Sequence, residues 1–68
     1  MAERDPRMEP KAGDETVSFY ETGCPWPRKV IGRDKKSVKW VTPEGEIKSD
    51  IVFWRKINKE AEVVHAAD

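Results

Sequence analysis

Reactive and crosslinking side chains are scarce in this chain of 68 residues. Its single cysteine, Cys24, and single histidine, His65, exclude an internal disulfide and a zinc site built from Cys and His ligands. No apolar run approaches the ~20 residues of a membrane-spanning helix. Charged residues stand between Met1 and Gly13, where a secretory signal would need an apolar segment. These absences predict an intracellular protein that has no contact with membranes.

Catalytic groups are equally sparse. An active site brings a nucleophile, a base and an orienting group together. Cys24 has no basic residue beside it in the sequence, and His65 lies in a polar stretch near the C-terminus. The sequence therefore predicts a protein that is not an enzyme and that holds neither a cofactor nor a metal ion.

Net charge is also missing, because thirteen basic residues balance thirteen acidic ones. The charges are nevertheless unevenly spread along the chain. Between residues 28 and 39 a single acid, Asp34, accompanies six basic residues: Arg28, Lys29, Arg33, Lys35, Lys36 and Lys39. Such a stretch gives a local positive field, which suits phosphate groups, although lysine-rich turns also serve solubility alone.

What remains is a short, polar-ended chain with one central region of alternating apolar residues. Residues 1–12 are rich in Pro, Glu, Lys and Arg and are expected to form a disordered leader. Residues 13–58 are expected to form the domain. Residues 59–68 form a polar tail, within which residues 61–67 could make a frayed helix.

The central region reads as short strands separated by turns. Val17 and Phe19 alternate with polar neighbours and are expected to face inward. Thr42-Pro-Glu-Gly45 has the chemistry of a tight hairpin, with Gly45 at positive φ, and Gly32 indicates a bulge or a bend. The expected strands cover residues 15–21, 28–33, 37–42, 46–49 and 54–57, with one helical turn over residues 50–53 capped by Ser49 or Asp50. Five short strands favour a small, closed, all-β barrel, because closure removes exposed edges.

Several motifs resemble the Tudor and PWWP branch of the SH3-like barrels. Gly13-Asp14, Val17-Ser-Phe-Tyr20 and Gly23-Cys-Pro-Trp-Pro27 running into Arg28-Lys-Val-Ile31 are similar to the opening of a PWWP domain. Val38-Lys-Trp-Val41, the Pro-Glu-Gly turn and residues 51–57 resemble the second half of a Tudor barrel. The resemblance implies a five-stranded SH3-like barrel that binds methylated lysine or arginine in an aromatic cage, or DNA through a basic surface.

The aromatic residues can be interpreted in two ways. Tyr20 or Phe19, together with Trp26 and Trp40, could converge into a cage that holds a cation by cation–π attraction. Phe19 and Trp40 could equally be core, since a small domain needs large side chains to fill it. Trp26, between two prolines, is hard to place in a core and is expected either at a contact surface or under its own loop.

Three functions remain open. The preferred hypothesis is a non-catalytic module that docks on nucleic acid or a nucleoprotein, with the six basic residues contacting phosphates and Trp26 stacking on a base. The first alternative is an adapter that holds a peptide, methylated or unmodified, against Tyr20, Trp26 and Trp40. The second is a small accessory or inhibitory protein of the kind that mobile elements encode. The oligomeric state stays open.

Overall fold

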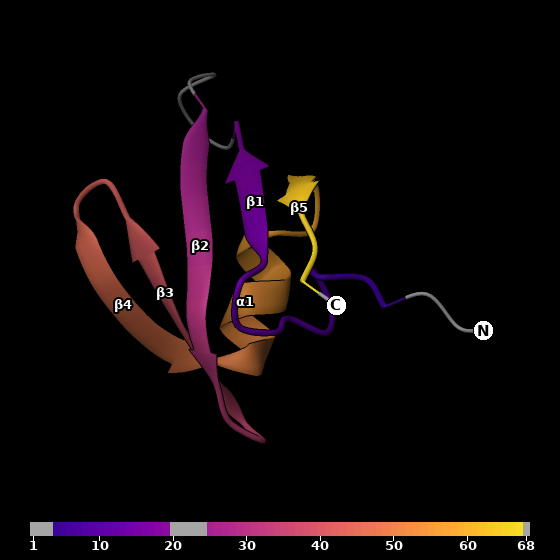
Figure 1. The fold of residues 1–68 in the computed structure, drawn as a ribbon, viewed down its shortest axis with the longest axis vertical. Helices are drawn as coiled ribbons and strands as arrows, with labels where there is room; N and C mark the ends of the chain where they lie inside the picture. The colour runs from indigo at the N-terminus through magenta and orange to yellow at the C-terminus, as the bar shows by residue number, and fades with distance from the viewer. Residues whose placement is uncertain (1–3, 20–24, 68) are drawn as a thin grey trace.

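The computed structural model describes residues 4–19 and 25–67. It contains β1 (Glu15–Ser18), β2 (Trp26–Arg33), β3 (Ser37–Thr42), β4 (Gly45–Asp50), α1 (Ile51–Ile57) and β5 (Glu62–His65). The five strands form one antiparallel sheet in the order β4-β3-β2-β1-β5 (Figure 1). The mostly β class is therefore confirmed. The sheet is open, however, since β4 and β5 are its two edges and do not pair in the described part of the chain.

The β3–β4 hairpin forms where the turn chemistry predicts it. Thr42 pairs with Gly45, and Gly45 has a φ of 133°, which a residue without a side chain adopts easily. The Thr42 hydroxyl accepts a hydrogen bond from the Glu44 N–H at 3.1 Å and donates one to the Gly45 carbonyl at 3.2 Å. Both the turn and the conformation of Gly45 agree with the sequence-based expectation.

Helix α1 is longer than the single turn expected from the sequence. Asp50, one of the two residues predicted as the cap, caps it, and its carboxylate accepts a hydrogen bond from the Phe53 N–H at 2.7 Å. The helix then continues through residues 54–57, so the prediction of a strand there is wrong. Ile51, Trp54 and Ile57 recur at intervals of three residues, which puts them on one face of a helix. That face packs against the core.

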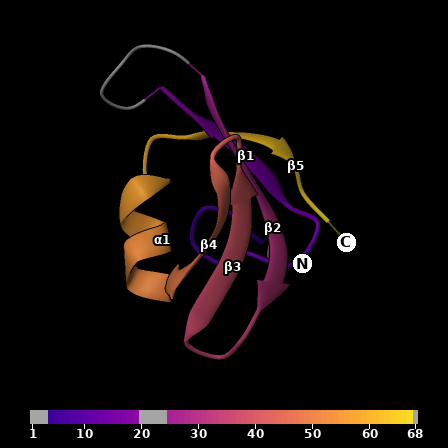
Figure 2. The same ribbon diagram turned by 90° about the vertical axis from the view of Figure 1, so that its left-hand side faces the viewer.

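Helix α1 lies on one side of the sheet (Figure 2), and the hydrophobic core lies between α1 and that face of the sheet. It consists of Val30, Val38, Trp40 and Trp54, with Ile51 and Ile57 packed against it. The two tryptophan rings meet edge to face, with centroids 5.1 Å apart and an angle of 62° between their planes. This geometry is the favourable one for aromatic pairs, and the two rings supply much of the volume of a small core.

Strand β1 presents the opposite face to the one predicted. Thr16 and Ser18 are buried, whereas Val17 is half-buried and Phe19 is 48% exposed. The reason is tertiary: the Thr16 hydroxyl donates a hydrogen bond of 2.5 Å to the side-chain oxygen of Asn58, which follows α1. A satisfied polar pair therefore takes the interior positions expected for Val17 and Phe19.

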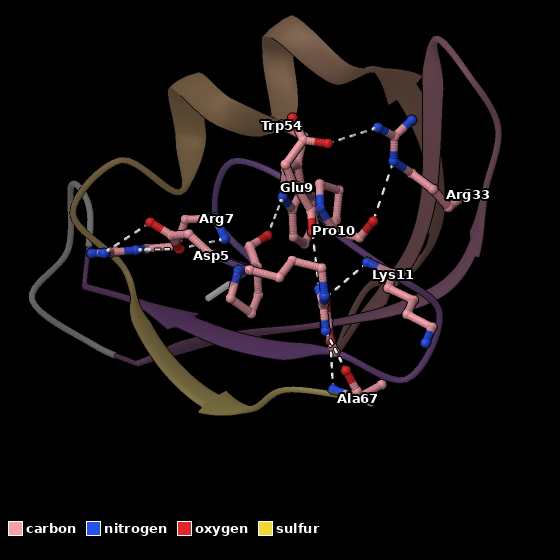
Figure 3. A network of polar contacts seen from close by, with 11 residues as sticks. Asp5, Arg7, Glu9, Pro10, Lys11, Arg33, Trp54 and Ala67 are labelled. Atoms are coloured by element: carbon pink, nitrogen blue, oxygen red, sulfur yellow. Dashed lines mark hydrogen bonds and ion pairs between the residues drawn. The ribbon is translucent and has the colours of Figure 1, made fainter. Parts of the chain in front are cut away.

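The N-terminal segment was expected to be a disordered leader, but residues 4–12 lie against the domain (Figure 3). Pro6 and Pro10 are buried. The Trp54 Nε1–H donates to the Pro6 carbonyl at 3.1 Å, and Arg33 Nε donates to the Pro10 carbonyl at 3.2 Å. The segment therefore supplies the hydrogen-bond acceptor for a buried indole N–H.

The C-terminal segment also differs from the expected tail. Residues 62–65 form β5, which pairs antiparallel with β1, in place of a frayed helix. Asp14, fully buried just before β1, joins this end to the N-terminus, because its carboxylate accepts hydrogen bonds from Arg4 and from the Ala67 N–H. Both ends of the described chain are thus held at one carboxylate.

Candidate functional site

The six basic residues of the predicted phosphate-binding surface do not share one face. Arg28 and Lys29 are neighbours on β2, and successive residues of a strand point to opposite sides of a sheet. Arg28 consequently faces the interior and is only 8% exposed, whereas Lys29 is exposed on the outer face.

Three of the remaining basic residues already have carboxylate partners. Lys29 lies 3.9 Å from Glu15, and Lys39 lies 3.7 Å from Glu46. Arg33 forms an ion pair of 3.6 Å with Glu9 of the N-terminal segment, and it also donates a hydrogen bond to the Pro10 carbonyl of that segment. These contacts neutralise much of the positive field that the sequence indicates.

Lys35 and Lys36 are the exception. Both are exposed in the β2–β3 turn, and neither has an ion-pair partner among the residues that the structure describes. Trp26 lies at the other end of β2, which has eight residues. At about 3.3 Å per residue, the strand separates the indole from these lysines by roughly 25 Å. The aromatic and basic parts of the predicted nucleic-acid site are therefore not brought together.

The aromatic residues do not form a cage in the described part of the chain. Trp40 is core, 1% exposed, and stacks with Phe53 at a centroid distance of 6.4 Å. The core interpretation of Trp40 is thus the one that the structure shows. Tyr20 lies outside the described residues. Trp26 is half-buried and stands opposite Ser18 in the β1–β2 register, so both occupy the inner face of the sheet.

A pocket of about 300 Å³ opens where β1 ends and α1 ends. Its walls come from two segments that are about forty residues apart: Ser18, Phe19, Lys56, Ile57, Lys59 and Glu60. Phe19 and Ile57 provide apolar surface. The rim carries one more positive than negative charge, because Lys56 and Lys59 stand beside a single acid, Glu60. Neither lysine has an ion-pair partner in the described residues.

A buried polar layer lies next to this pocket. Thr16, two residues before Ser18 on the same face of β1, bonds Asn58, and Asn58 also accepts a long hydrogen bond of 3.5 Å from Arg28 Nη1. No carboxylate of the described chain lies within ion-pair distance of Arg28, and burial lowers the pKa of its guanidinium. The interior beside the pocket is therefore electropositive.

Sequence reasoning missed this pocket. It placed Phe19 in the core or a cage and residues 54–57 in a strand. Neither assignment predicts that Phe19 and Ile57 line one pocket. The three-residue spacing of Ile51, Trp54 and Ile57 was the signal that could have revealed the helix and, with it, the basic positions at its end.

Metal ligands are not clustered in the described residues. These residues contain no group of three His, Cys, Asp or Glu side chains placed to hold a metal ion. Across residues 4–19 and 25–67, no helix is long and apolar enough to cross a membrane.

Comparison with known proteins adds no relative. No family model matches the sequence, and searches of curated proteins and of solved structures give no match. The candidate function therefore rests on the geometry of the pocket and on the charges around it.

Proposed function

We propose that this chain is a non-catalytic interaction module that binds a protein segment in the pocket between β1 and α1. The segment carries an apolar side chain next to a carboxylate. We keep the SH3-like relationship as part of the proposal, because a strand order of β4-β3-β2-β1-β5 with a helix before the last strand is compatible with it.

The observation that carries the proposal is the combination of surfaces in the pocket. Phe19 and Ile57 offer apolar walls, and Phe19 is nearly half exposed although it is aromatic. Burying such a ring against a ligand stabilises a complex by roughly 1.5 kcal/mol or more. Lys56 and Lys59 at the rim attract a carboxylate and repel a methylated ammonium. The pocket thus favours an acidic, apolar peptide over the methylated peptide suggested by the family resemblance.

A titration of ¹⁵N-labelled protein with the peptide acetyl-Asp-Leu-Glu-amide tests this function. We expect chemical-shift changes at Ser18, Phe19, Ile57 and Lys59, and none with acetyl-Lys-Leu-Lys-amide. Phe19→Ala should weaken binding about tenfold, the effect of losing an exposed ring that contacts the ligand. Phe53→Ala is the matched control, because Phe53 is 45% exposed but does not line the pocket. Equal affinity for both peptides, or equal effects of the two variants, would refute the assignment.

Nucleic-acid docking remains a second candidate because Lys35 and Lys36 are exposed and unpaired in the described chain. Two lysines release few counterions, so the affinity for a short DNA duplex should be low and should depend only weakly on salt. Lys35→Glu with Lys36→Glu should abolish that binding and leave the peptide titration unchanged. A duplex that shifts the amides of Trp26 together with those of residues 35–36 would instead favour the nucleic-acid function.

A further inference from the structure

The outer edge of β4 is an unpaired strand edge. In the strand order, β4 has β3 on one side and no neighbour on the other, and Figure 1 shows it as the left-hand border of the sheet. The strand has six residues, and its residue Ile47 is 41% exposed. An edge of this length can pair with another chain unless some feature prevents it.

The hydrogen-bond pattern shows which groups point outward. The Ile51 N–H donates to the Lys36 carbonyl at 2.9 Å, just beyond the pair formed by Ser37 and Asp50. That pair is therefore one of the non-hydrogen-bonded pairs, which alternate with hydrogen-bonded pairs along an antiparallel ladder. By the same alternation, Glu46 and Lys48 direct their backbone N–H and C=O groups toward the free edge.

The side chains of β4 are complementary to a second copy of the same strand. Ile47 lies on the inner face, since it pairs with the buried Trp40, and Glu46 and Lys48 lie on the outer face. A two-fold axis through Ile47 places Ile47 opposite Ile47 of the second copy. It places Glu46 opposite Lys48 of the second copy, and Lys48 opposite its Glu46. The edge-facing backbone groups of Glu46 and Lys48 then meet in hydrogen-bonded pairs, and Ile47 falls at the closely spaced pair between them.

We propose that two copies of the chain pair antiparallel through β4, in the register that sets Ile47 against Ile47, and so continue the sheet across a two-fold axis. The interface is isologous and closes on itself, which limits assembly to a dimer. Opposite charges face each other at the two pairs that flank Ile47, whereas the same register sets Asp50 opposite Glu44 of the second copy. The net charge of the chain is zero, so no net repulsion between whole chains opposes association. The peptide pocket is lined by residues at or just after the ends of β1 and α1 and by none of β4, so the dimer leaves it open.

Charge exchange on the edge gives the sharpest test. Glu46→Lys places two lysines opposite each other, and Lys48→Glu places two glutamates opposite each other, so each variant should be monomeric. The double variant, Glu46→Lys with Lys48→Glu, restores opposite charges and should dimerise again. An equimolar mixture of the two single variants should form a heterodimer, because the register pairs Lys with Glu at both positions. Lys59→Glu is the control for a changed net charge away from the edge.

Sedimentation equilibrium between about 10 µM and 1 mM provides the measurement, since an interface smaller than the standard size gives micromolar or weaker association. We expect the wild type and the Lys59→Glu control to approach twice the chain mass, with each single edge variant at least about tenfold weaker. A third perturbation, Lys48→Pro, removes one edge-facing N–H and should also give a monomer while circular dichroism shows the fold intact. A wild type that is monomeric throughout, a dimer that survives the single variants, or a mass that rises beyond two copies would each overturn the proposal.

Discussion

Replacing Asp14 by alanine should remove the contact that holds both termini to the domain. The carboxylate is fully buried and accepts hydrogen bonds from Arg4 at 2.5 and 3.0 Å. It also accepts from the backbone N–H groups of Lys11 and Ala67, each at 2.7 Å. The two backbone donors would lose their acceptor in the variant, whereas the Arg4 guanidinium would lose its ion pair and keep the backbone carbonyls of Glu9 and Ala67 as acceptors.

The magnitude follows from these contacts. Leaving a buried donor without a partner costs about 1–3 kcal/mol, and breaking a buried ion pair costs about 3–5 kcal/mol. The Arg4 side chain is 29% exposed, so water compensates part of its loss. We therefore expect Asp14→Ala to lower the free energy of unfolding by about 3 kcal/mol, a large share of the roughly 3–10 kcal/mol typical of a chain this size. Asp14→Asn keeps one acceptor oxygen and should lose about 1–2 kcal/mol.

Lowering the pH should weaken the same contact of the Asp14 carboxylate. Burial by itself raises the pKa of Asp14, but the hydrogen bonds from Arg4, Ala67 and Lys11 outweigh it, and the pKa of the folded protein lies below the ordinary value of 3.8. The folded state then binds fewer protons than the unfolded state. The stabilisation is complete above the unfolded pKa and is lost as pH falls from that value through the folded pKa. The difference in stability between wild type and Asp14→Asn should therefore shrink below about pH 4.

Urea unfolding monitored by tryptophan fluorescence, at neutral pH and at pH about 3, measures both effects. Glu15→Gln is the matched control, because the Glu15 side chain is 41% exposed and its ion pair with Lys29 is long. That variant should lie within about 1 kcal/mol of the wild type. If Asp14→Ala is as stable as Glu15→Gln, the carboxylate does not hold the termini in solution and the reasoning fails.

Two further predictions concern the turn and the core. Gly45→Val should lose about 1–2 kcal/mol from backbone strain alone, because Gly45 has positive φ and no atom lies within 4 Å of an added Cβ. Gly32→Ala, whose Cβ would meet its nearest neighbour at an ordinary 3.8 Å, is the control and should be near neutral in thermal denaturation. Trp54→Phe should cost about 1 kcal/mol more than Trp40→Phe, because only Trp54 loses a hydrogen bond, the one to the Pro6 carbonyl, whereas Trp40 Nε1 is buried without a partner. Equal urea midpoints for the two tryptophan variants would contradict the bond to Pro6.

Local chemistry explains which elements the sequence predicted well. The hairpin closed by Gly45 and the helix cap at Asp50 depend on residues within a few positions of each other, and both are present. The irregularity at Gly32 is also present, as a shift in the β2–β3 register. In each of these cases the local sequence favours the conformation, so no distant partner is needed to select it.

Contacts between residues far apart in the sequence explain where the sequence-based predictions differ from the structure. Val17 and Phe19 alternate as an inward face should, yet Thr16 takes the interior because Asn58, forty-two positions away, accepts its hydrogen bond. The predicted basic surface is divided between two faces for a related reason. The basic stretch that contains Arg28 and Lys29 was treated as one surface, although the period of a strand sends these two side chains to opposite sides. That separation was available from the sequence; the pocket at Ile57 was not, because it needs the fold of α1 onto β1.

Deleting residues 1–10 separates the two descriptions of the N-terminal segment most directly. A disordered leader can be removed without effect, whereas the observed segment supplies the acceptor for Trp54 Nε1 and buries Pro6 and Pro10. Trp54 is fully buried, so its donor would be left without a partner, at about 1–3 kcal/mol, and the apolar contacts of the prolines add to this loss. The deletion also removes Arg4 from the buried Asp14 carboxylate, so we expect it to lower the unfolding free energy by at least about 3 kcal/mol in urea titrations. The further effect of Trp54→Phe should be smaller in the shortened chain than in the full one. An unchanged urea midpoint after the deletion would instead mean that the segment does not contribute to the folded domain in solution.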